Sequence, residues 1–274
     1  MPSSNPAFSR GFPAAGNGQS AGWGAGPQQT MGGAPTQYDP YGKPAQSPYA
    51  ATDRAYMTMD DVVTRTGLTF LVTVLAAAAT WTLVPDGVAI GLALPAVLVG
   101  FVLAMVISFK QIANPVATLS YAALQGVVVG AISELYDANF GGGIVMQAVI
   151  GTFGVFAGML IVYKTGAIRV TPKLTRWIVG ALFGVLALVL VNLVASFFTP
   201  GGLGLRDGSP IAIIFSLVVI GVAAFSLLLD FDMADEAIRR GVAPKFAWYI
   251  AFGLLVTVVW LYMEILRLLS YFRD

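Results

Sequence analysis

The chain has 274 residues, of which 57% are hydrophobic and 11% are charged, and its mean hydropathy is +0.78. An average soluble domain carries about 25% charged residues, so this composition indicates an integral membrane protein. The sequence contains no cysteine and no histidine, which excludes disulfides, thiolate or imidazole metal sites and serine–histidine catalysis. We expect no cofactor and no nucleic-acid partner.

Residues 1–57 form the first predicted segment and are rich in Gly, Pro, Ser, Gln and Ala. A segment of this composition cannot bury enough apolar surface to fold alone, so we expect a disordered Gly/Pro-rich tail. Its tyrosine-containing stretch 38–49 is a candidate binding segment for a partner protein. The remaining residues, 58–274, form the second predicted unit, a transmembrane domain.

Seven apolar stretches follow the tail, and each is long enough for the roughly 20 residues that a helix needs to cross the hydrocarbon core. Turn-forming residues separate them, for example at 85–87 and 200–202. Short connections of this kind predict antiparallel neighbours in one all-α bundle. The predicted spans are 66–84, 88–109, 113–136, 143–163, 177–198, 211–234 and 246–270.

Lys and Arg are distributed unequally between the two sets of loops. If the tail lies inside, Arg206 is the basic residue of the outer loops, and the inner side holds Arg54, Arg65, Lys110, Lys164, Arg169, Lys173, Arg176, Arg239, Arg240 and Lys245. The positive-inside rule therefore predicts a cytoplasmic N-terminus. Seven spans place the C-terminus outside, where Arg273 runs against the rule, whereas a re-entrant last helix would place it inside.

Two further patterns concern packing and anchoring. Gly126 and Gly130 form a GxxxG pattern in the third span, which lets a neighbouring helix approach closely. Several aromatic residues near span ends are interpreted as anchors at the membrane–water interface; they are Trp81, Trp177, Trp248, Tyr163 and Tyr249.

The sixth span ends in LLLDFDMADE, residues 227–236, which brings carboxylates into or near the hydrocarbon. A charge there costs about 3 kcal/mol on insertion scales unless it is paired or hydrated. Asp235 and Glu236 each precede a basic residue by four positions, the favourable order for an ion pair on a helix. We therefore predict structural pairs of Asp235 with Arg239 and of Glu236 with Arg240.

Asp230 and Asp232 lack a base at that spacing. Side chains two residues apart on a helix point in directions that differ by about 200°, so those of Asp230 and Asp232 cannot face the same cavity. Asp232 lies about 10 Å inward of Arg239 at 1.5 Å per residue, which is inside the hydrocarbon. We predict that Asp232, and secondarily Asp230, lines an ion pathway.

Glu264 lies about 28 Å along the last helix from Lys245, so together with Glu134 of the third span it forms an outer level of acids. Thr257 lies two turns before Glu264 on the same helical face. Oxygen ligands at several levels suit hard cations such as Ca²⁺, or protons. Asp232 and Glu264 are accordingly predicted as ligands along a cation pathway, with an ion pair between Glu264 and Arg267 as the structural alternative.

Two stretches, LLLDFDMADEAI and AFGLLVTVVWLYMEILRLL, together resemble the paired last helices of the Bax inhibitor-1 family, and LQGVVVGAISE in the third span supports this. The resemblance covers about residues 55–274, and MTMDDVVTRTGL looks most like bacterial members, which implies a bacterial plasma membrane. It implies a seven-helix bundle whose central last helix is wrapped by two layers of three. It also implies a slow, pH-sensitive Ca²⁺ leak.

Within this resemblance, Asp232 matches an aspartate of the sixth helix and Thr257 stands where the family has a second aspartate in the seventh. Glu134 matches a glutamate of some members. The family's pH gate is described as two aspartates that share a proton, which Thr257 cannot do. The resemblance therefore leads us to expect that Asp232 titrates alone and controls an inner gate.

Three functions remain open at this point. A cation leak channel is favoured, with the lipid bilayer, Ca²⁺ and protons as partners. The alternatives are a proton-coupled cation exchanger and a non-transporting membrane interaction protein or stress modulator. An intramembrane aspartyl protease is disfavoured because no GxGD motif follows the pair at 136–137, and we expect no enzymatic activity.

Overall fold

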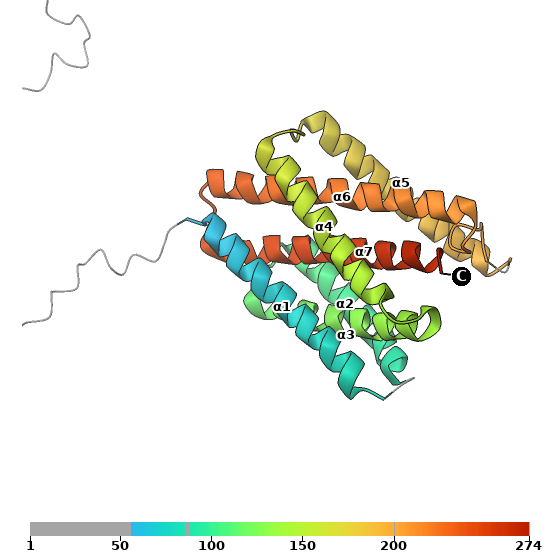
Figure 1. Ribbon diagram of the computed structural model, residues 1–274. Helices are drawn as coiled ribbons and strands as arrows, with labels where there is room; N and C mark the ends of the chain where they lie inside the picture. The colour runs from blue at the N-terminus through green and yellow to red at the C-terminus, as the bar shows by residue number, and fades with distance from the viewer. Residues whose placement is uncertain (1–55, 86–87, 200, 274) are drawn as a thin grey trace, which may run out of the picture. The chain divides into compact units, whose positions relative to one another are not determined.

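The computed structural model describes residues 56–85, 88–199 and 201–273. Within these residues the transmembrane domain consists of seven long α-helices and one short 3₁₀ helix before the last of them (Figure 1). Each of the seven is long and apolar enough to cross a membrane, which confirms the predicted all-α bundle. The helices are α1 (Met59–Leu83), α2 (Val88–Lys110), α3 (Pro115–Phe140), α4 (Ile144–Thr165), α5 (Pro172–Ser196), α6 (Pro210–Arg239) and α7 (Ala247–Ser270), and the 3₁₀ helix is η3 (Pro244–Phe246).

Helix α1 begins seven residues before the predicted span. Thr58 and Asp61 form a capping box, in which the Asp61 amide donates to the Thr58 hydroxyl and the Thr58 amide donates to the Asp61 carboxylate. This box satisfies amides that a helix end otherwise leaves unpaired. The polar first turn therefore extends the helix beyond the apolar residues that the span prediction counted.

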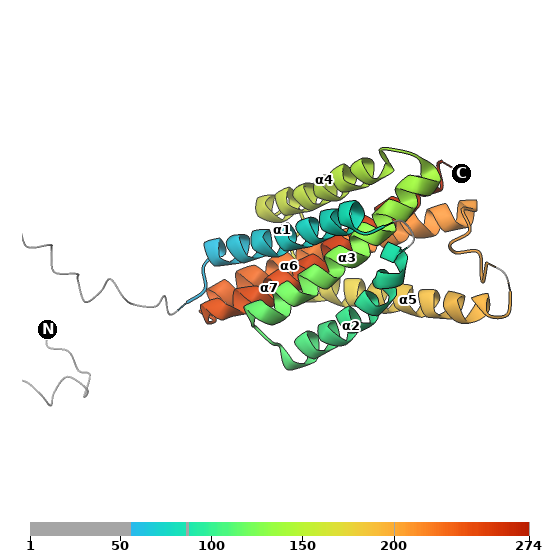
Figure 2. The same ribbon diagram turned by 90° about the horizontal axis from the view of Figure 1, so that it is seen from below.

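Helix α7 is the most enclosed element of the bundle. In its most apolar stretch 67% of the residues are buried, against 17% for α2, α4 and α5. It packs against α1, α3, α4 and α6, whereas α2 lies mainly on α3 and α5 mainly on α6 (Figure 2). Polar side chains on α7 are therefore held away from lipid, which is where a membrane protein can keep them.

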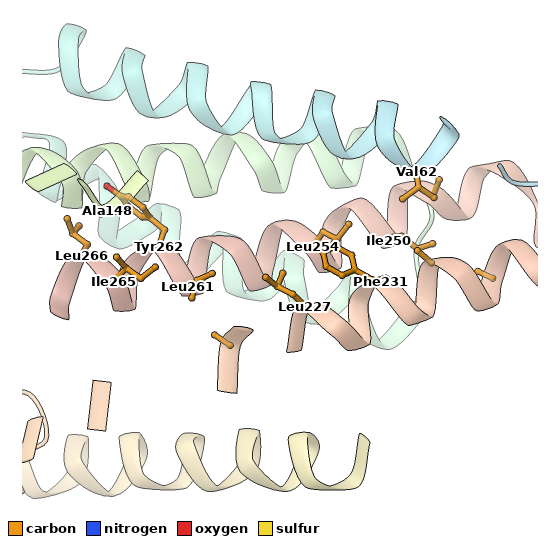
Figure 3. Packing of buried hydrophobic residues seen from close by; sticks show 14 of the residues in the cluster. Val62, Ala148, Leu227, Phe231, Ile250, Leu254, Leu261, Tyr262, Ile265 and Leu266 are labelled. Carbon is orange, nitrogen blue, oxygen red and sulfur yellow. The ribbon is translucent and has the colours of Figure 1, made fainter. Parts of the chain in front are cut away.

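The largest cluster of buried apolar residues surrounds the contact between α6 and α7. Leu227 and Phe231 of α6 lie against Leu254 and Leu261 of α7, and Ala148 of α4 joins the same cluster (Figure 3). Phe231 also makes edge-on ring contact with Phe156 of α4, at 5.5 Å between centroids. This packing fixes the register of α6 against α7 and thereby the positions of the acids on both helices.

The GxxxG pattern of α3 brings α1 and α3 into close contact. A Cβ atom added at Gly126 would lie 2.5 Å from the Ala76 Cβ and 2.5 Å from the Thr73 carbonyl oxygen. A Cβ atom at Gly130 would lie 2.5 Å from the Ala77 carbonyl oxygen. Glycine is thus required at both positions, as the pattern predicts for a small-residue helix contact.

The two ends of the bundle differ in charge. We call the end where α1 and α7 begin the basic end, since the described residues Arg65, Lys110, Lys164, Arg169, Lys173, Arg176, Arg239, Arg240 and Lys245 lie there. Arg65 of α1 donates to the Pro244 carbonyl and lies 5.5 Å from the Trp248 ring centroid. These contacts hold the start of α7 against α1.

Helix α7 crosses the bundle without a break and ends at the end opposite the basic end (Figure 1). There the Arg273 guanidinium donates to the carbonyl oxygens of Phe140 and Gly141, at 3.2 and 3.0 Å, and to the Gln147 side chain. The structure therefore decides against a re-entrant last helix. Arg273 caps the turn between α3 and α4, which accounts for a basic residue on this side.

Candidate functional site

The contact between α6 and α7 contains one direct bond between polar side chains near the middle of the bundle. The Thr257 hydroxyl donates to Asp230 Oδ2 at 2.7 Å, and it lies 3.3 Å from the Gly253 carbonyl of its own helix. Thr257 is 8% exposed and Asp230 is partly buried. Gly253 faces the same carboxylate, since a Cβ atom there would lie 3.8 Å from Asp230 Oδ1.

The residue of α6 that faces Thr257 is Asp230, whereas the resemblance matched Asp232 to the family's aspartate of this helix. The reason is helical geometry, because two positions along α6 rotate the side chain by about 200° and send Asp232 to another face. Asp230, treated above as secondary, therefore occupies the contact with α7.

Asp232 instead lines a cavity of about 870 Å³ at the basic end of the bundle. The walls come from α1, α4, α6, α7 and the connection between α4 and α5. We call this the basic-end cavity, and its polar or charged lining residues are Thr66, Tyr163, Lys164, Arg169, Asp232, Asp235 and Arg239. Its volume lies within the roughly 300 to 1,000 Å³ that is usual for ligand sites.

Tyr163 of α4 is the residue of this cavity that sequence analysis missed. Its hydroxyl lies 3.4 Å from Asp232 Oδ1 and 3.4 Å from Asp235 Oδ2, so it bridges the two carboxylates. The position of Tyr163 near the end of its span suggested an anchor at the membrane–water interface. No pattern in the α4 sequence indicated a contact with the acids of α6. A contact between residues 69 positions apart becomes visible only in the folded bundle.

The basic-end cavity also contains a buried polar atom without a partner. Thr66 is 7% exposed, and its hydroxyl makes no hydrogen bond to any described residue. Buried hydroxyl groups almost always have a partner, which is often an ordered water molecule. This hydroxyl therefore adds an available polar group to a cavity wall that also holds two carboxylates.

The two ion pairs predicted at the end of α6 are present in the structure. Arg239 lies 3.4 Å from Asp235 Oδ2, and the Arg240 guanidinium contacts Glu236 Oε1. The side chains of Arg239, Arg240 and Glu236 are largely exposed. Each of the two pairs therefore contributes about 0.3–0.5 kcal/mol as a surface helix pair. Asp235 differs from Glu236 because it also lines the basic-end cavity.

Glu264 is 4% exposed and is engaged by a single arginine. Arg267 Nη1 donates to both of its carboxylate oxygens at 2.8 Å. The ion pair considered as the structural alternative is therefore present, and it occupies the oxygens that a cation would need. Glu264 also lines a different cavity from Asp232, so the two predicted cation ligands do not meet in one site.

The outer acid Glu134 is only partly buried, but its Oε2 atom is enclosed and accepts no hydrogen bond from the described residues. Its neighbour Ser133 shares a 2.7 Å hydrogen bond with the Tyr262 hydroxyl of α7. This bond ties α3 to α7 two residues before Glu264. Among the described residues no group of three or more Asp, Glu, His or Cys side chains is arranged to hold a metal ion.

Comparison with known proteins agrees with this architecture. A family model described as Bax inhibitor 1 like matches residues 5–274. The chain belongs to this family. The match to the Bax inhibitor 1 like family begins inside the segment 1–57, further toward the N-terminus than the stretch 55–274 over which the sequence motifs carry the resemblance.

A relative of unknown function shows similarity over a shorter stretch. An uncharacterised protein of Chlamydia muridarum (strain MoPn / Nigg) is 35% identical over 82 residues, which are 30% of this chain and 34% of the relative. The chain thus spans about a third of the length of that relative, which carries no described activity. Membership of the Bax inhibitor 1 like family rests on the long family match.

Proposed function

We propose that this protein is a cation leak channel of the plasma membrane, with Ca²⁺ as the permeant ion and intramembrane carboxylates as its pH-sensitive gate. The observation that carries the proposal is the sequence of acids along α6. Asp235 and Asp232 line the basic-end cavity. Asp230 lies two residues further from the basic end along α6, in the contact with α7. Carboxylate oxygens are the ligands that hard cations prefer.

The basic-end cavity is lined by three bases and two acids, but the bases are exposed whereas the acids are partly buried. Lys164, Arg169 and Arg239 are exposed, so mobile ions screen their charges, and Arg239 is already paired with Asp235. Asp232 lies further inside and carries no ion pair among the described residues; its partner is the Tyr163 hydroxyl. A partly buried carboxylate with a weak partner is available to a passing cation.

The Asp230–Thr257 bond acts as the closed gate in this proposal. It joins α6 to α7 where the walls of the cavity end, and the surrounding cluster with Leu227 and Leu254 is apolar. A cation that moves deeper must replace the Thr257 hydroxyl as the partner of Asp230. Protons compete with cations for both Asp230 and Asp232, which links conduction to pH.

The proposal is tested by Ca²⁺ flux into liposomes that contain the purified full-length chain, at several pH values from 6 to 8. We expect flux above that of empty liposomes, with a pH dependence that Asp232→Asn and Asp230→Asn each reduce. Asp207→Asn, in the loop between α5 and α6, serves as the control acid and should behave like the native chain. A pH profile unchanged in both α6 variants would contradict the gate.

The flux experiment also separates the alternatives. The exposed bases at the mouth of the cavity would suit an acidic protein segment, as expected for an interaction protein. That function predicts no flux from the folded chain, and it predicts that the α6 variants change stability alone. An exchanger would require a counter-flow of protons, which a pH-sensitive dye inside the liposomes measures during Ca²⁺ uptake.

A further inference from the structure

A second cavity, of about 540 Å³, lies between α5 and α7 and takes no part in the proposed ion pathway. Its α5 wall is apolar and faces the surrounding lipid, since Val179, Phe183 and Leu186 are all substantially exposed. Trp260 and Met263 of α7 form the opposite apolar wall. The volume lies within the roughly 300 to 1,000 Å³ of ligand sites.

One end of this cavity is charged. Arg206, from the connection between α5 and α6, and Arg267 of α7 line it together with Glu264. Glu264 is satisfied by Arg267 Nη1 alone, which leaves the other N–H groups of that guanidinium free of the carboxylate. Two arginines against one glutamate give the charged end an excess of one positive charge.

Arg206 has no acidic partner in the part of the chain that the structure describes, because no carboxylate there lies within 4.0 Å of its guanidinium. It is nevertheless partly buried, and this burial together with the nearby charge of Arg267 lowers its pKa. Both effects disfavour the positive charge, and a bound anion would offset both. An arginine in this setting is suited to a phosphate group, which its planar fork can bind through two hydrogen bonds.

The depth of these groups in the membrane identifies the anion. Arg267 lies in the last turn of α7 and Arg206 in a loop, so the charged end is at headgroup level on the side opposite the basic end. The apolar wall on α5 extends from Val189 to Val179, which lies about 15 Å further from the charged end at 1.5 Å per residue. The cavity thus has a phosphate-binding end and a hydrocarbon-lined end in the arrangement of a phospholipid.

We propose that the cavity between α5 and α7 is a binding site for one anionic phospholipid, with its phosphodiester on Arg206 and Arg267 and one acyl chain along the α5 wall. Helix α5 packs mainly on α6, so the lipid fills the space that α5 leaves open beside α7. This site does not depend on ion conduction, and its test reads lipid binding directly.

The test is native mass spectrometry of the full-length chain, purified in mild detergent and offered phosphatidylglycerol or phosphatidylcholine at equal concentration. We expect one phosphatidylglycerol to be retained at least about tenfold better than phosphatidylcholine. Both lipids carry the phosphodiester, but the choline cation of phosphatidylcholine is repelled by the excess positive charge of the charged end. Arg206→Gln should abolish this preference. Leu182→Trp, which fills the apolar wall and keeps the charges, should lower the retention of phosphatidylglycerol.

Arg176→Gln is the matched control, since it removes an exposed arginine from the other end of α5. It should retain phosphatidylglycerol like the native chain. Equal retention of the two lipids by the native chain would overturn the proposal, and so would unchanged retention by a monodisperse Arg206→Gln variant. Displacement of the lipid by inorganic phosphate alone would show that the site binds the free anion and would also overturn it.

Discussion

Thr257 of α7 donates its hydroxyl proton to Asp230 of α6 at 2.7 Å, and this bond lies at the inner edge of the proposed ion pathway. A threonine can satisfy the aspartate in either protonation state, because a hydroxyl both donates and accepts. A second aspartate in its place would instead repel an ionised Asp230 and share a proton with it at lower pH. The nature of residue 257 therefore determines how strongly this contact responds to pH.

Thr257→Val tests the contribution of the bond to stability. Valine has nearly the shape of threonine but offers Asp230 no donor, so the free energy of unfolding should fall by about 1–3 kcal/mol. Thr257→Ser keeps the hydroxyl and should lose less. Unfolding in mixed micelles measures both, and a larger loss for Thr257→Ser than for Thr257→Val would show that the methyl group, not the hydroxyl, matters.

Thr257→Asp tests the pH response. Two facing carboxylates titrate as a coupled pair, whose members cannot both ionise without repulsion. Ca²⁺ flux into liposomes should therefore depend more steeply on pH in this variant than in the native chain. Thr257→Asn provides the control, because it adds similar bulk without a titratable group and should not steepen the profile.

Arg267→Gln removes the partner of a buried carboxylate. Breaking a buried ion pair from one side costs about 3–5 kcal/mol, since the remaining charge is uncompensated. The double variant Glu264→Gln with Arg267→Gln should be closer in stability to the native chain. Unfolding of the three proteins in mixed micelles checks both expectations.

Gly126→Ala tests the close contact of α1 with α3. The added methyl group would lie 2.5 Å from the Thr73 carbonyl oxygen, so the two helices must separate, at a cost of about 1–3 kcal/mol. Gly154→Ala in α4 is the matched change, because a Cβ atom there meets nothing within 4 Å. That variant should gain up to about 1 kcal/mol from helix propensity. Similar unfolding midpoints for the two variants would contradict the argument.

The expected orientation, with the basic end in the cytoplasm, can be tested through introduced thiols. The native sequence has no cysteine, so Lys173→Cys and Asp207→Cys each carry a single label site, at opposite ends of α5. A membrane-impermeant maleimide applied to intact cells should label Asp207→Cys alone. Labelling of Lys173→Cys alone would reverse the orientation and would place the basic-end cavity outside.

Much of this protein could be predicted from local patterns. The apolar lengths predicted seven helices, because a membrane-spanning segment must satisfy its own backbone hydrogen bonds. The four-residue spacing predicted the pairs of Asp235 with Arg239 and of Glu236 with Arg240, since such neighbours meet on any α-helix. Helix rotation also predicted that Asp230 and Asp232 face different surroundings.

The partners of those two acids were decided only by the tertiary structure. Asp230 meets Thr257 and Asp232 meets Tyr163, and both contacts depend on the register and rotation of α6 against α7 and α4. That register is set by the packing of side chains such as Phe231 and Leu254, which a one-dimensional pattern does not contain. The sequence by itself determined the membrane class, the helices and the acids, and the packing of whole helices decided which acid faces which partner.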